Sequence, residues 1–103
     1  MEFIKKLEGN KLTIEISGRL NTTTTPELVQ ELETSLDGIE SLVFDFDKLE
    51  YISSSGLRVL LSTHKKMMKQ GEFTIINVSE DVMEVLEITG FASLISVSKI
   101  NRI

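Results

Sequence analysis

The residues that could carry chemistry are concentrated in one short stretch, Ser53-Ser54-Ser55-Gly56. It lies between an apolar run that ends near Phe46 and a long segment whose apolar residues have helical spacing. The first N–H groups of a helix have no partner within the helix, and the helix dipole adds about half a positive charge there. A phosphate on a serine at this point would bring a charge of about −1.5 to −2 to the positive end of the helix. The stretch therefore predicts either a modification site or a plain N-cap with two small loop residues.

Gly56 and Arg58, at and just after the end of this stretch, are candidates for contact with a partner protein. A glycine in the first turn costs a helix about 1 kcal/mol. We expect Gly56 to be there because the missing side chain lets the backbone or active site of another protein approach. Arg58 lies one turn into the helix. It is expected to be exposed and to contact a charged partner.

Other candidates for catalysis are weaker. His64 is ten residues beyond Ser54, about 15 Å along a helix, so it cannot be the base for that serine and is predicted to be a partly buried structural residue. The nucleophile elbow and the glycine-rich nucleotide loops are missing. The predicted protein is therefore no enzyme and takes no cofactor.

A metal site has one weak candidate. Asp45 and Asp47 share strand parity and suggest magnesium. The simpler interpretation is that Asp45 ends a strand and Asp47 shapes the following turn, so we predict no metal.

The first half of the chain is predicted from its periodicity. Alternating apolar residues over 11–17 indicate a half-buried strand, and a weaker strand over 3–7 precedes it. Gly9-Asn10 supplies a tight turn between them, which predicts a hairpin. Pro26 opens an amphipathic helix that ends near Asp37-Gly38. Residues 41–46 indicate a central strand covered on both faces, at least at its start.

The second half alternates in the same way. The serine stretch starts a helix that ends at Gln70-Gly71, with Met67 and Met68 at the edge of the core. A strand is predicted over 73–78. Ser79 caps a third helix, which Gly90-Phe91 ends. Residues 94–97 are expected to form a last edge strand.

These elements predict an α/β fold, a small mixed β-sheet with an N-terminal β-hairpin and about three helices packed mainly on one face. We expect one domain over residues 1–103, with an ordered core over 1–97 and a frayed tail over 98–103. No long hydrophobic edge is evident, so the oligomeric state is left open and a monomer is favoured.

Composition excludes several classes of partner. Sixteen acidic residues against eleven basic ones argue against binding to nucleic acid or to anionic membranes. Cysteine is absent, which excludes thiol chemistry. No segment reaches the roughly 18 apolar residues of a membrane span, and the N-terminus does not have the pattern of a signal peptide, so a cytoplasmic location is expected.

The order of the predicted elements and four sequence segments resemble those of a known family. Over nearly its whole length the chain resembles the STAS domain family, the module named for sulphate transporters and anti-sigma factor antagonists. The segments that match are Ser17-Gly-Arg-Leu-Asn21, Leu42-Val-Phe-Asp-Phe46, Tyr51-Ile-Ser-Ser-Ser-Gly-Leu-Arg-Val-Leu60 and Ile88-Thr-Gly-Phe91.

The resemblance implies a phosphorylation site. Stand-alone members commonly read Asp-Ser-Ser-Gly-Leu, and the first serine of that motif accepts a phosphate. The acceptor is then Ser54, with Ser53 and Ser55 as alternatives, because Ser53 replaces the motif's acid. Asn21 also stands where the family often has an acid. The partner contacts implied are Asn21, Ser53, Ser54, Ser55, Gly56, Leu57 and Arg58.

The function implied is that of an anti-sigma factor antagonist. The unphosphorylated protein would bind an anti-sigma factor that is also a serine kinase and so release a sigma factor; phosphorylation would end binding, and a phosphatase would restore it. The alternative is a non-switching STAS scaffold or binding subunit of a transport or signalling assembly, which Ser53 and Asn21 favour. A weak nucleotide hydrolase is a third interpretation, without a base or a phosphate loop.

Overall fold

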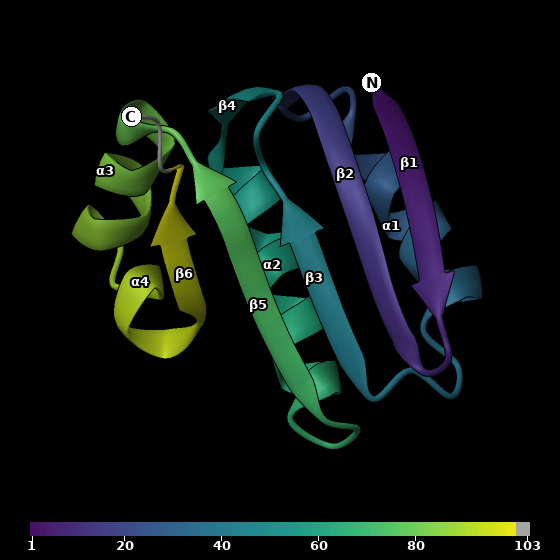
Figure 1. The fold of residues 1–103 in the computed structure, drawn as a ribbon. Coiled ribbons are helices and arrows are strands. Elements are labelled where there is room, and N and C mark those ends of the chain that lie inside the picture. Colours follow the sequence, from purple (N-terminus) through teal and green to yellow (C-terminus); the bar gives the residue numbers. More distant parts are fainter. Residues whose placement is uncertain (101–103) are drawn as a thin grey trace.

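The computed structural model describes residues 1–100 and confirms a mixed α/β fold. The strands form one six-stranded sheet, and the helices lie mainly against one of its faces (Figure 1). The strands are β1 (Glu2–Glu8), β2 (Lys11–Leu20), β3 (Ser41–Asp45), β4 (Leu49–Ile52), β5 (Glu72–Val78) and β6 (Ser96–Lys99). The helices are α1 (Thr25–Ser35), α2 (Ser54–Met67), α3 (Glu80–Ile88) and α4 (Phe91–Leu94).

The sheet has the order β1-β2-β3-β5-β6. β1 and β2 form the predicted antiparallel hairpin, and all other pairs are parallel. Gly9 has a φ of 62°, which a glycine at the first central position of a two-residue turn adopts without strain. β4 pairs only with the far end of β2, over Gly18 to Leu20.

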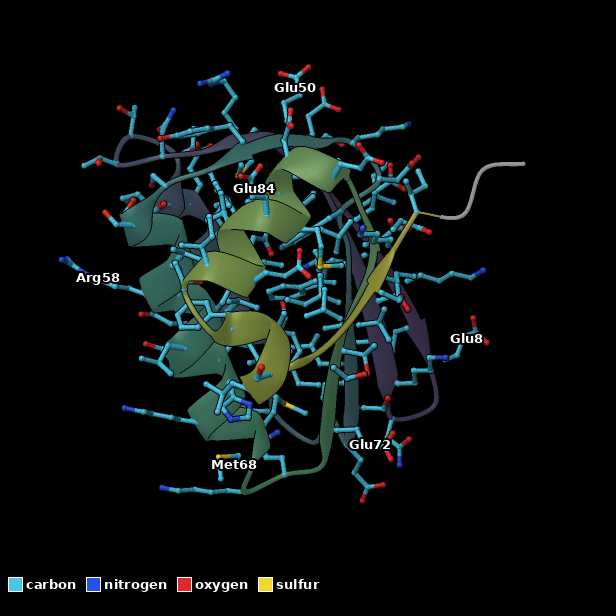
Figure 2. All side chains as sticks on the ribbon, turned by 90° about the vertical axis from the view of Figure 1, so that its left-hand side faces the viewer. Glu8, Glu50, Arg58, Met68, Glu72 and Glu84 are labelled. Carbon is cyan, nitrogen blue, oxygen red and sulfur yellow. The ribbon has the colours of Figure 1, made fainter. Side chains whose placement is uncertain are left out.

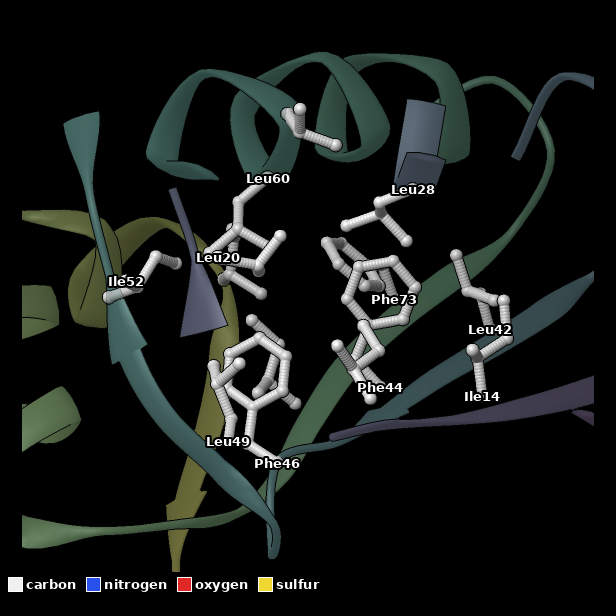
Figure 3. Packing of buried hydrophobic residues seen from close by; sticks show 14 of the residues in the cluster. Ile14, Leu20, Leu28, Leu42, Phe44, Phe46, Leu49, Ile52, Leu60 and Phe73 are labelled. Carbon is white, nitrogen blue, oxygen red and sulfur yellow. The ribbon is translucent and has the colours of Figure 1, made fainter. Parts of the chain in front are cut away.

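The core fills the space between the sheet and the helices. Apolar side chains from β2, β3 and β5 meet those of α1 and α2 (Figure 3). Phe44 stacks with Phe46 at a centroid distance of 6.2 Å and meets the edge of Phe73 at 5.0 Å. The stripe of α1 predicted from the sequence, Leu28, Leu32 and Leu36, is buried.

β3 differs from the prediction. It is central, but only one of its faces is covered by helices, because Leu42 and Phe44 are buried while Val43 is only partly buried. The opposite face of the sheet carries half-buried polar residues such as Thr13 and Thr74. Val43 is flanked on this face by Thr13 and Thr74 of the neighbouring strands, so a dense apolar run does not require helices on both faces of the sheet.

The C-terminal part also differs in detail. Leu94 belongs to the short helix α4 and not to the edge strand, which begins at Ser96. The tail expected to fray from 98 onward is instead part of β6 through Lys99, and the Ile100 N–H donates to the Val78 carbonyl at 3.0 Å. Residues 101–103 of that predicted tail lie outside the described residues. No helix within residues 1–100 has the length and apolar character that crossing a membrane requires.

Candidate functional site

The three serines stand where four elements meet. β4 leads directly into α2 through Ser53, and the Ser53 N–H donates to the Leu20 carbonyl at the end of β2 at 2.8 Å. Asn21 follows β2, and Thr25 begins α1. The backbone bond between Ser53 and Leu20 therefore holds the start of α2 against the loop that starts α1.

Ser53 is the N-cap of α2. Its φ and ψ of −97° and 178° are those of an extended residue, and its Oγ accepts the Gly56 N–H at 3.5 Å. The expectation that one of the serines caps the helix is confirmed. The cap satisfies one of the N–H groups that the first turn leaves without a partner.

Three side-chain hydroxyls and one backbone carbonyl form a chain of hydrogen bonds that starts at this cap and runs in one direction. The Thr25 Oγ1–H donates to the Asn21 carbonyl at 2.6 Å. Its single hydrogen is used there, so the Ser55 hydroxyl, 3.2 Å away, must donate to Thr25. By the same reasoning the Ser53 hydroxyl donates to Ser55 at 2.7 Å. The chain therefore uses the hydrogens of Ser53 and Ser55 inside the protein.

Ser54 is placed differently from its two neighbours. It is the first residue of α2 and is exposed, whereas Ser53 and Ser55 are half-buried. Within residues 1–100, its hydroxyl takes no part in the chain just described. Ser54 therefore combines an accessible hydroxyl with a position at the positive end of a helix.

The structure gives a different reason for a glycine at position 56 than the one expected from the sequence. It is buried, and a Cβ at this position would lie 2.8 Å from Ile52 Cγ1 and 3.2 Å from Leu20 Cβ. The missing side chain makes room for β4 and β2 inside the protein. The interpretation that it lets a partner approach is wrong.

Asn21 is occupied by its own loop. Its Oδ1 accepts the N–H groups of Thr23 and Thr24 at 3.0 and 3.1 Å. This turn shapes the entrance to α1 and brings Thr25 to the serines. Asn21 thus supports the site through the backbone and remains half-buried.

Leu57 and Arg58 continue the site along α2. Leu57 is partly buried and packs against the core, whereas Arg58 is exposed as expected and projects away from the helix (Figure 2). Arg58 borders a groove of about 230 Å³ between α1 and α2 that the sequence did not indicate. The groove is lined by Val29, Leu32, Glu33, Leu36, Arg58, Val59, Ser62, Thr63 and Lys66.

The two aspartates lie at another strand end. Asp45 Oδ1 accepts from Asn77 Nδ2 and from the Asp47 N–H, both at 3.0 Å. This agrees with Asp45 ending the strand and Asp47 shaping the turn. Within residues 1–100, no group of three side chains is arranged to hold a metal ion.

The far part of α2 holds the remaining candidates. His64 is half-buried, as expected for a structural residue. Met67 is buried, but Met68 is 70% exposed at the end of the helix (Figure 2). The expectation that both methionines border the core is therefore wrong for Met68, because it lies beyond the last turn that faces the sheet.

Comparisons with known proteins agree on one family. The family model described as STAS domain matches residues 3–102. BtrV of Bordetella bronchiseptica, provisionally named an anti-sigma factor antagonist, is 38% identical over 95 residues, which are 90% of this chain and 81% of that protein. The anti-sigma-B factor antagonist of Bacillus subtilis is 28% identical over 94 residues, 90% of this chain and 86% of its own length.

Solved structures share the fold at lower identity. A protein of Thermotoga maritima, provisionally described as an anti-sigma factor antagonist, has a TM-score of 0.88 at 18% identity, covering 94% of this chain and 86% of its own. The Bacillus cell fate determinant SpoIIAA in its phosphorylated form has a TM-score of 0.73 at 16% identity, covering 93% and 90%.

Proposed function

The chain belongs to the STAS domain family, and from this membership we propose that it is an anti-sigma factor antagonist switched by phosphorylation of Ser54. In its unmodified form it binds an anti-sigma factor and so releases a sigma factor. The names of its relatives support the first half of this proposal. The second half depends on the geometry of the serine stretch.

One observation carries the choice of Ser54. Of the three adjacent serines, Ser54 is the exposed one, and the hydroxyl groups of Ser53 and Ser55 donate within the protein. A kinase must reach the hydroxyl oxygen and remove its hydrogen. Phosphorylation of Ser55 would break its contacts to Ser53 and Thr25, whereas phosphorylation of Ser54 breaks none of these.

The surroundings of Ser54 suit an added phosphate. The group would lie at the N-terminus of α2, where the helix dipole favours negative charge. Arg58 stands four residues further along the same helix, within reach of a group at position 54. Ser53 replaces the acid of the family motif, so no carboxylate stands at the N-cap to repel the phosphate. The modification therefore leaves the fold unchanged.

The same phosphate would end binding. We place the partner's interface over Ser54, with Arg58 and Leu57 beside it and Asn21, Ser53, Ser55 and Gly56 supporting the surface from below. An interface that closes over a neutral hydroxyl would have to bury a dianion after phosphorylation. Arg58 carries a single positive charge and cannot balance the whole dianion. Charge left without a partner at an interface costs several kcal/mol, and about 4 kcal/mol weakens binding roughly a thousandfold.

The proposal includes the machinery of the switch. The anti-sigma factor is itself the serine kinase, a protein phosphatase restores the hydroxyl, and the exchange takes place in the cytoplasm. The chain is a substrate in this scheme and not an enzyme.

The test is a phosphorylation assay with matched serine variants. The chain is used to capture its partner from an extract of the native cell, and the captured kinase is incubated with ATP and the wild-type, Ser54→Ala or Ser55→Ala chain. Intact mass should show one phosphate on the wild type and on Ser55→Ala, and none on Ser54→Ala. Full modification of Ser54→Ala would refute the assignment. Capture of transport subunits in place of an ATP-binding kinase would support the scaffold function instead.

A further inference from the structure

The edge strand β1 is open to pairing with another strand. It has seven residues, pairs with β2 on one side along its whole length, and contains neither proline nor a break in register. Ile4 and Leu7 on it are 56% and 62% exposed. Natural edge strands are usually protected by shortness, proline, a bulge or lysine, and of these devices β1 has only lysine.

The two lysines of β1 protect this edge poorly. The Nζ of Lys5 is bonded to Glu31 Oε2 at 2.9 Å and to Ser35 Oγ at 3.3 Å, so the side chain reaches back over α1. Lys6 contacts Glu8 on its own strand at 3.7 Å, and both side chains are at least 70% exposed. Because this ion pair is long and exposed, Lys6 can exchange Glu8 for an acidic residue on another chain.

The hairpin register determines which groups face outward. Glu8 and Lys11 flank the two-residue turn, and such a pair exchanges its backbone hydrogen bonds. Bonding alternates along the ladder, so the backbone groups of Phe3, Lys5 and Leu7 point away from β2. The side chains of the even-numbered residues lie on the face away from the helices, because they oppose polar residues such as Thr13 and Glu15.

We propose that a second copy of this chain pairs with β1, antiparallel, about a two-fold axis at Ile4. In this register Ile4 faces Ile4 of the second copy, and Glu2 faces Lys6 twice. The outward backbone groups of Phe3 and Lys5 meet those of the second copy, as a hydrogen-bonded ladder requires. Moving the axis to Lys5 would set Lys5 against Lys5 and Glu2 against Glu8. Charge complementarity therefore selects the register centred on Ile4.

The helix-side face of β1 supports the same register. There Leu7 of the second copy lies opposite Met1. Met1 borders a cavity of about 340 Å³ between β1 and α1, lined also by Phe3, Glu27, Gln30, Glu31 and Thr34. In this register the exposed Leu7 of each copy lies beside Met1 and Phe3, the two apolar residues of the cavity lining, and the contact occurs twice by symmetry.

The dimer is independent of the proposed switch. β1 forms one edge of the sheet, whereas Ser54 begins α2 behind the central strands (Figure 1). A single pair of strands is a small interface, so the association is weak. Loss of dimerisation would leave the phosphorylation assay unchanged, and the two proposals can fail separately.

Single cysteines test the register directly, because the chain has no cysteine of its own. Two Ile4→Cys residues would form a pair with Cα atoms about 4.5 Å apart, within the range of a disulfide. Two Lys6→Cys residues on the same face would be about 14 Å apart. In a glutathione buffer, the Ile4→Cys chain should form disulfide dimers at least about tenfold faster than the Lys6→Cys chain. Equal rates, or a faster Lys6→Cys, would overturn the proposal.

A charge reversal gives the second test without a cross-link. Lys6→Glu places a carboxylate opposite Glu2 at both ends of the paired strands and should weaken dimerisation, measured by sedimentation equilibrium, about tenfold. The double variant Glu2→Lys with Lys6→Glu restores opposite charges and should recover the wild-type dimer. Thermal unfolding confirms that each variant is folded. A wild type that remains monomeric at all concentrations, or a double variant that does not recover, refutes the proposal.

Discussion

Two polar clusters lie at the carboxyl ends of parallel strands, at the same edge of the sheet. The serine cluster follows β4 and is tied to the end of β2. The aspartate cluster follows β3 and is tied to β5 by Asn77. The first is made of neutral hydroxyls, and the second contains a carboxylate whose Oδ1 accepts two hydrogen bonds. Among residues 1–100, only the first places a reactive side chain, Ser54, on the surface without a hydrogen bond that holds it.

On the function proposed above, this difference would separate a site of partner binding from a cluster that only supports the fold. Asp45 is half-buried and fixes a turn, and Asn77 beside it has the left-handed φ of 57°. In the serine cluster, Ser53, Ser55 and Thr25 fix the backbone, and Ser54 is left exposed among them. We therefore expect changes at Ser54 to alter binding and not stability, and changes at Asp45 to do the reverse.

The largest expected effect is that of Ser54→Asp on binding. The carboxylate mimics the charge of a phosphate, so affinity for the captured anti-sigma factor should fall by about a hundredfold to a thousandfold in titration calorimetry. The free energy of unfolding should change by less than about 0.5 kcal/mol. Ser54→Thr, which keeps the hydroxyl, serves as the control. An aspartate variant that binds like the wild type would remove the distinction between the two clusters.

The second expected effect is that of Asp45→Ala on stability. Two hydrogen bonds to a carboxylate are lost and the Asn77 side chain is left without this partner, which should lower the free energy of unfolding in urea by about 2 kcal/mol. Glu50→Ala, at an exposed position of β4 (Figure 2), is the control and should change stability by less than about 0.5 kcal/mol. Binding to the anti-sigma factor should remain unchanged. A binding loss equal to that of Ser54→Asp would mean that the aspartate cluster also belongs to the interface.

The smallest expected effect compares neighbouring serines within one cluster. Ser55→Ala removes two bonds of the hydroxyl chain and should cost about 1 kcal/mol of unfolding free energy. Ser54→Ala removes neither and should lie within about 0.5 kcal/mol of the wild type. Both can be measured in the same urea series. Equal losses would show that Ser54 contributes to the fold as its neighbours do.

The fold could be predicted largely because its elements have clear periods. The stripe of α1 and the alternation in β2 carry enough information to identify each element alone. β4 was missed because it has only four residues and its buried members, Leu49 and Ile52, are three apart. It also pairs with β2 next to a shift in register, between Gly18 and Arg19.

The site could be predicted in position but not in detail. The residues next to one another in sequence were sufficient to identify the serine stretch and its cap. The bond between Ser55 and Thr25 joins residues 30 apart, and no local pattern indicates it. Gly56 was misinterpreted for a similar reason, since Leu20 and Ile52 reach it through a strand pairing that was not anticipated.

The hydroxyl chain around Ser53 runs in one sense, from the cap toward the Asn21 carbonyl, because each oxygen has a single hydrogen to give. An aspartate at position 53, as the family motif commonly has, could only receive. The Ser55 hydroxyl would then donate to this aspartate and no longer to Thr25. The Thr25 oxygen would lose its donor. The identity of the capping residue thus determines the direction of the hydrogen bonds beneath the surface on which the proposed kinase would act.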